Sequence, residues 1–201
     1  VSTAGTTVSG DINVAGTTSS GGSTLYALRV SDAASGGTVT LQNKVTADFT
    51  SQWSKDDAET YSAVSGISVA PGYTGNLNIS DGSEVSLTAN GANVSGSTLL
   101  VSNGTEDTKI QLGKNVNLSY VYTDNINVAN YLNASALSNR GGSITADEGL
   151  TVSAESTAGS ENNLVGVFSY NGGNFAAGKK AKIQATASAS VSDQKVIVHG
   201  V

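Results

Sequence analysis

Two places in this chain attract attention as candidates for acid–base or metal chemistry. Asp56 and Asp57 form an acidic pair within the segment 50–60, and the single histidine, His199, lies close to the C-terminus. Two carboxylates about 5–9.5 Å apart can cleave a glycosidic bond by general acid–base catalysis. Together with Glu59, the pair also offers oxygens to a calcium ion, although such a site needs about six to eight oxygen ligands.

Other patterns that carry chemistry are missing from the sequence. It contains no G-x-S-x-G, H-E-x-x-H or phosphate-binding loop motif, and no D-x-D-x-D-G calcium loop. It also has no cysteine, which removes disulfides and thiolate metal ligands. We therefore expect no enzyme activity, no cofactor and no metal site.

Acidic residues outnumber basic ones, with 16 Asp and Glu against 10 Lys and Arg, for a net charge of −6. Nucleic acid is therefore an unfavourable partner, because a phosphate backbone is bound by a surface of lysine and arginine. No apolar stretch reaches the roughly 18 residues of a membrane span, so we do not expect the chain to insert into a membrane. The absence of Cys and Met, both open to oxidation, favours a place outside the cell.

A repeat in the sequence predicts the secondary structure that positions these residues. One spacing of five apolar or small positions recurs six times, and its first positions lie 31 to 38 residues apart. Each copy is therefore one unit of an array. The copies span 6–16, 39–49, 77–89, 110–120, 144–154 and 175–185, and their third positions are Ile12, Val45, Val85, Val116, Leu150 and Ala181.

Within a copy, residues two apart face the same side of a strand, and a three-residue gap carrying turn residues such as Asn43 or Gly113 separates two strands. A third apolar pair follows each copy: Leu28/Val30, Ile67/Val69, Leu99/Val101, Ala134/Ala136, Val165/Val167 and Val196/Val198. Three strands per copy predict an all-β fold, a right-handed parallel β-helix (solenoid) of about six three-strand coils. The alternative is a β-sandwich, which also has short alternating strands.

We expect a single β-solenoid domain over residues 1–201, in which equivalent residues stack. The predicted inner column is Val39, Leu77, Ile110, Ile144 and Phe175. Loops between the second and third strands project from such a rod, and the longest of them is rich in aromatic and acidic residues. Our candidate binding residues are Trp53, Asp56, Asp57, Tyr61 and Tyr73.

The coil also bears on the acidic pair and the histidine. Polysaccharide hydrolases built on a parallel β-helix carry an Asp-Asp pair and a Gly-His-Gly motif, to which Lys55-Asp56-Asp57 and Val198-His199-Gly200 are partly similar. In a coil these two segments fall four repeats apart, roughly 19 Å by the spacing of strands. We therefore predict no catalytic residue and interpret the acidic pair as part of a solvated loop.

The segment 141–154, GGSITADEGLTVSA, and its counterparts at 173–187 and 37–49 resemble passenger domains of bacterial type V autotransporter adhesins. This resemblance implies an extracellular β-helix on the bacterial cell surface that mediates cell adhesion, self-association or biofilm formation. The implied partners are a host surface protein or glycan, or identical chains as a homo-oligomer.

The ends of the chain leave two further interpretations open. The first copy begins almost at Val1 and the last predicted strand reaches Val201 without a polar cap. Because an open coil exposes unpaired backbone groups, we expect either a part of a longer surface rod or a subunit of a self-assembling filament or surface layer. A polysaccharide-binding or polysaccharide-cleaving β-helix protein is the second alternative.

Overall fold

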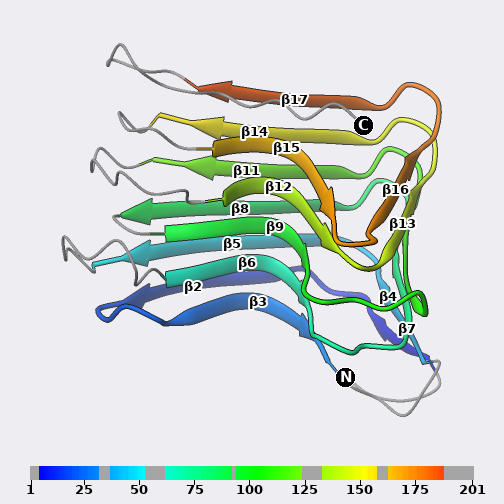
Figure 1. Ribbon diagram of the computed structural model, residues 1–201, viewed down its shortest axis with the longest axis horizontal. Helices are drawn as coiled ribbons and strands as arrows, with labels where there is room; N and C mark the ends of the chain where they lie inside the picture. The colour runs from blue at the N-terminus through cyan, green and yellow to red at the C-terminus, as the bar shows by residue number, and fades with distance from the viewer. Residues whose placement is uncertain are drawn as a thin grey trace.

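The computed structural model describes residues 5–31, 37–52, 62–91, 94–123, 133–157 and 163–187. These residues form three sheets in which every strand pairs in parallel with strands one coil away. The strands of the second and third sheets run across the picture in Figure 1, and those of the first sheet stand along its right side. The chain winds from the first coil at the bottom to the last at the top.

The three sheets share one repeating order of strands. The first sheet contains β1 (Thr6–Val8), β4 (Thr38–Leu41), β7 (Gly75–Ile79), β10 (Thr108–Leu112), β13 (Ser143–Ala146) and β16 (Asn174–Ala177). The second contains β2 (Ile12–Thr18), β5 (Lys44–Ser51), β8 (Glu84–Gly91), β11 (Asn117–Tyr122), β14 (Thr151–Ser156) and β17 (Lys182–Ala187). The third contains β3 (Thr24–Val30), β6 (Ser62–Val69), β9 (Val94–Val101), β12 (Asn133–Arg140) and β15 (Asn163–Tyr170).

Because each strand pairs with the strands three places before and after it, the chain is a parallel β-helix of about six coils. The predicted architecture is confirmed, and the β-sandwich alternative is wrong. The inner column of the first sheet is also confirmed, since Ile110 pairs with both Leu77 and Ile144. These three side chains are buried. Each such side chain contributes roughly 1.5–3 kcal/mol when it leaves water.

The register predicted for the second sheet is correct between most coils, but it is wrong by two residues between the third and fourth coils. The repeat pattern predicts Val116 opposite Val85, but the structure pairs Leu118 with Val85. The corner between the first and second sheets is longer from the third coil onward, where it runs from Ile79 to Val85. Val116 belongs to the longer corner of the fourth coil, and its side chain is buried there beneath the turn.

The longer corners share one turn geometry. In the first two coils only three residues separate the flanking inward positions, whereas five do so in the later coils. The extra length includes a residue in the left-handed region: Gly82 (φ 71°), Asn115 (φ 55°), Gly149 (φ 83°) or Lys180 (φ 61°). The turns stack through backbone hydrogen bonds from Gly82 N to Lys114 O and from Asn115 N to Glu148 O.

A second register error lies in the third sheet. The pattern predicts Ala134 opposite Leu99, but the structure pairs Leu137 with Leu99 and Ala134 with Gly96. Each strand of this sheet bends in its middle, so that the two inward residues on either side of the bend are three apart instead of two, as Gly96 and Leu99 are in β9. Thr98 lies at the bend of β9, and its hydroxyl donates a hydrogen bond of 2.7 Å to the Ser119 carbonyl of the second sheet.

Opposite charges follow one another along the corner between the first and second sheets. Lys44 Nζ lies 3.1 Å from Glu84 Oε2, and Lys180 Nζ lies 2.6 Å from Glu148 Oε1. Each of these pairs joins one coil to the next. They therefore favour the observed register of the coils, in the way that cross-strand pairs favour the register of a sheet.

Candidate functional site

Most of the predicted binding residues cannot be placed. Trp53, Asp56, Asp57 and Tyr61 lie outside the described residues, and so does His199. Their predicted roles, and the expected distance between the acidic pair and the histidine, stay predictions.

Tyr73 is the member of the predicted set that the structure describes, and it lies in the interior. It follows the turn at Pro71 and Gly72, and only 2% of its surface is exposed. Its hydroxyl donates to the Asn76 carbonyl at 3.1 Å and lies 3.4 Å from the Gly37 carbonyl. Burial raises the pKa of this phenol above its ordinary value. In this position Tyr73 packs between two coils, and its ring does not face solvent.

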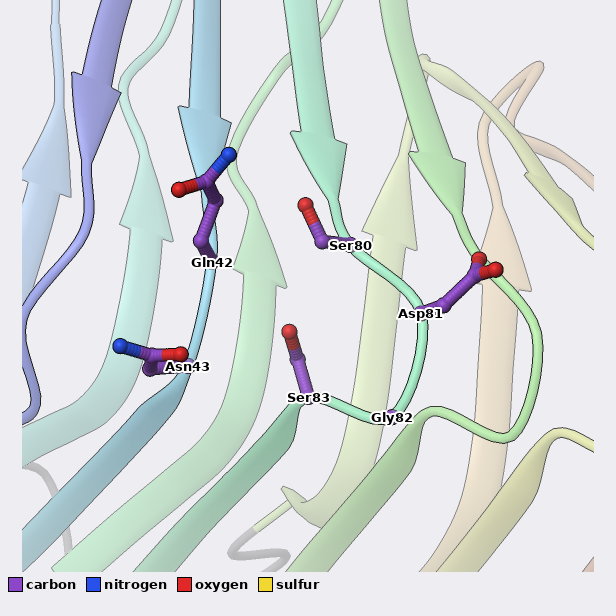
Figure 2. A pocket seen from close by; sticks show the side chains of 6 residues that line it. All are labelled: Gln42, Asn43, Ser80, Asp81, Gly82 and Ser83. Atoms are coloured by element: carbon purple, nitrogen blue, oxygen red, sulfur yellow. The ribbon is translucent and has the colours of Figure 1, made fainter.

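A depression of about 200 Å³ opens where the short corner of the second coil meets the long corner of the third (Figure 2). It is lined by Gln42, Asn43, Ser80, Asp81, Gly82 and Ser83. The extra residues of the third coil extend past the shorter turn beside them, which leaves the space unfilled. The two-residue insertion in the copy at 77–89 is visible in the sequence and marks this place.

Hydroxyl and amide groups surround the depression. The Ser83 side chain points toward Ser80 in Figure 2, and its buried hydroxyl has no hydrogen-bond partner among the described residues. Asp81 points away, toward the fourth coil, where its Oδ1 accepts a hydrogen bond of 2.8 Å from Lys114 N. Because the Asp81 carboxylate is engaged by the fourth coil, the residues that line the depression offer no general acid or base. The depression can hold water or another small neutral hydroxyl compound.

Within the described ranges, no three acidic, histidine or cysteine side chains gather closely enough to hold a metal ion. The same ranges contain no helix with the length and hydropathy of a membrane span.

One column on the outer face of the second sheet consists of uncharged polar side chains, with charged residues such as Asp48 and Glu155 two positions further along the strands. Thr46, Ser86, Ser119 and Ser153 pair in succession over four coils, and each is half-buried. Asn13 precedes them in the first coil, and Gln184 follows in the last. Such a face can donate and accept hydrogen bonds at each coil, with neighbouring groups spaced by about 4.8 Å.

Comparison with known proteins gives no relative. No protein-family model matches the chain, and searches of the curated proteins and of the solved structures found no match. What the chain does must therefore be argued from its own surfaces.

Proposed function

We propose that the chain is an extracellular module of a bacterial surface adhesin, similar in kind to autotransporter passenger domains, that mediates cell adhesion or self-association. The observation that carries this proposal is the column of hydroxyl and amide groups along the outer face of the second sheet. Many weak contacts of one kind, repeated at a fixed spacing, add up through multivalency. Its partners are a host surface protein or glycan, or identical chains, and we assign it no catalytic activity.

The test uses beads coated with the purified chain, whose aggregation and attachment to cells are measured by light scattering and microscopy. Replacing Ser119 and Ser153 with Glu places two like charges in adjacent coils of the outer column and should reduce both signals at least severalfold. The matched control puts the same substitutions at Ser143 and Asn174, on the first sheet. The proposal fails if beads coated with the wild-type chain neither aggregate nor attach. The hydrogen-bonding explanation fails if a tenfold increase in salt abolishes association, because uncharged contacts are little screened.

A second candidate function is that of a subunit in a self-assembling filament. The exposure of inward residues in the first and last described coils supports it. Val14 in the first coil and Ile183 in the last are half-buried, whereas their equivalents in the middle coils, such as Leu87 and Leu118, are buried. Addition of another coil from an identical chain would cover them. Electron microscopy of the purified chain separates the candidates, because long uniform fibres support the filament and discrete short particles support the module.

A further inference from the structure

The outer face of the third sheet differs in charge from the rest of the chain. In its five described strands the only charged residues are Arg29 on β3 and Arg140 on β12. These are also the only two arginines of the sequence, in a chain whose net charge is −6. The protein is acidic as a whole, but the described strands of this face carry only positive charge.

Each of these arginines is held against a tyrosine. The Arg29 guanidinium carbon lies 5.4 Å from the centre of the Tyr26 ring, and Arg29 Nη1 donates to the Tyr26 hydroxyl at 3.3 Å. The Arg140 guanidinium carbon lies 5.8 Å from the ring of Tyr170, which is the residue paired with Arg140 in the next coil. Stacking on a ring holds the planar guanidinium in place and leaves N–H donors directed outward.

Neither arginine has a carboxylate partner among the residues that the structure describes. The ion pairs found there are made by lysines, at Lys44 and Lys180. A guanidinium offers a planar fork that matches a carboxylate or a sulfate with two parallel hydrogen bonds. In the described part of the chain, each guanidinium therefore keeps N–H donors that can take an external anion, although one donor of Arg29 is used by Tyr26.

The spacing of the two arginines defines the shape of that anion. One outward row of the sheet runs through Arg29, Ser68, Leu100, Ser138 and Phe168. Arg140 lies two residues beyond Ser138 on the same strand, so three coil spacings, about 14 Å, separate the arginines along the rod. A single small anion cannot contact both, whereas an extended chain with separated acidic groups can.

The side chains around the arginines indicate the chemistry of the chain that fits. Tyr26 is 36% exposed, and the rings of Tyr170 and Phe168 lie 4.5 Å apart at the other end of the row. Aromatic rings pack on apolar surfaces such as the C–H faces of sugars, and Ser68 offers a hydroxyl between the two ends. Nucleic acid is bound by a surface of many lysines and arginines, and the described strands of this face carry only two basic residues.

We propose that the outer face of the third sheet binds an acidic polysaccharide, with Arg29 and Arg140 each taking one carboxylate or sulfate group. This inference rests on the proposed adhesive function, because it names one class of partner and adds a second surface, on the third sheet, that would bind it. The sugar rings lie across the outward row that contains Ser68, and the rings of Tyr26 and Tyr170 contact them at the two ends.

The experiment measures binding of the purified chain to immobilised polygalacturonate, dextran sulfate and neutral dextran. The double variant Arg29→Gln/Arg140→Gln should lose at least tenfold in affinity for one or both acidic polymers. The matched control Lys109→Gln/Lys182→Gln removes the same charge from the first and second sheets and should bind like the wild type. The variant Arg29→Lys/Arg140→Lys keeps the positive charge but loses the planar fork of N–H donors. Its affinity for the acidic polymers should lie between those of the wild type and the glutamine double variant.

Three results would overturn the inference: equal binding to dextran and the acidic polymers, an equal loss in the lysine control, or tighter binding to polyglutamate, which would assign the face to an acidic peptide. Should the arginine double variant not fold, Tyr26→Ala/Tyr170→Ala tests the same two ends.

The bead assay separates this inference from the adhesive function. Beads that bind glycan without attaching to cells contradict only the function, and beads of the arginine variant that attach normally contradict only the inference.

Discussion

Among the described residues, charged side chains are paired in one region of the molecule and lack a partner of opposite charge in another. The first region is the corner between the first and second sheets, and the second is the outer face of the third sheet. At the corner, lysines meet glutamates of the adjacent coil, as in the pair of Lys180 and Glu148. On the third sheet, Arg29 and Arg140 rest on tyrosine rings without a carboxylate in the described residues. Charges that are paired inside the chain hold the coils in register, whereas unpaired arginines remain available for a partner.

The largest expected effect is a loss of stability on substitution of an inward residue of the third sheet, compared with an outward residue beside it. Leu99 faces the core and is fully buried, while its neighbour Leu100 faces outward and is half-buried. Leu99→Ala should lower the free energy of unfolding by about 2–5 kcal/mol through loss of packing and creation of a cavity. Leu100→Ala should cost about 1 kcal/mol or less. Urea unfolding measures both, and equal losses would contradict the assignment of the two faces.

Alkaline pH should lower the stability of the fold through the buried phenol of Tyr120. Burial raises the pKa of Tyr120 above its ordinary value of 10.0, and nearby Tyr122 raises it further. The unfolded chain therefore releases this proton first, so stability is full below about pH 10 and is lost as the pH rises further. The loss should reach about 1.4 kcal/mol per pH unit. Unfolding of the wild type and of Tyr120→Phe between pH 9 and 11 measures it, and identical slopes would refute the assignment to Tyr120.

The core contains a similar contrast between two buried tyrosines of β11, because one hydroxyl forms a hydrogen bond and the other forms none within the described part of the chain. The Tyr122 hydroxyl donates to the Gly91 carbonyl at 2.8 Å, whereas the buried Tyr120 hydroxyl has no hydrogen-bond partner among the described residues. Tyr122→Phe should lower the free energy of unfolding at pH 7 by about 1 kcal/mol. Tyr120→Phe should leave it unchanged or raise it by about 1 kcal/mol. A loss of equal size in both variants would indicate that Tyr120 also has a partner.

The smallest effect is expected at the charged corner. Glu148→Gln removes the carboxylate that Lys180 contacts, and the side chains of Lys180 and Glu148 are 78% and 47% exposed. The free energy of unfolding should fall by less than about 1 kcal/mol at low salt, and the difference should vanish at high salt. Glu106→Gln serves as the control for loss of one negative charge in the loop after β9. An effect that persists in high salt would show that Glu148 acts by packing and not by charge.

The sequence predicted the winding of the chain because one spacing recurs in every coil. It did not predict the pairing of Leu118 with Val85, since a two-residue lengthening of a corner leaves the alternation of apolar residues intact. Nor did it predict the bend in the third sheet. There, inward residues three apart, such as Ala134 and Leu137, break the two-residue period on which the prediction relied.

The surfaces were less accessible to prediction than the fold. Tyr73 follows a Pro-Gly turn and was expected at the surface, but its ring packs between two coils and its hydroxyl bonds to the Asn76 carbonyl. The two arginines stand 111 residues apart in the sequence, and only the stacking of the coils brings them onto one face. Their placement on an acid-free sheet could be recognised only once the register was known.

The change in corner length between the second and third coils makes the winding unequal along its axis. A duplicated unit from the later part, such as the one that contains Asn115, would carry a turn that matches its neighbours on both sides. A duplicated unit with the short corner at Asn43, placed among the later ones, would meet a longer turn above and below it. Growth of this rod by gene duplication is therefore easier in its C-terminal two-thirds than in its first two windings.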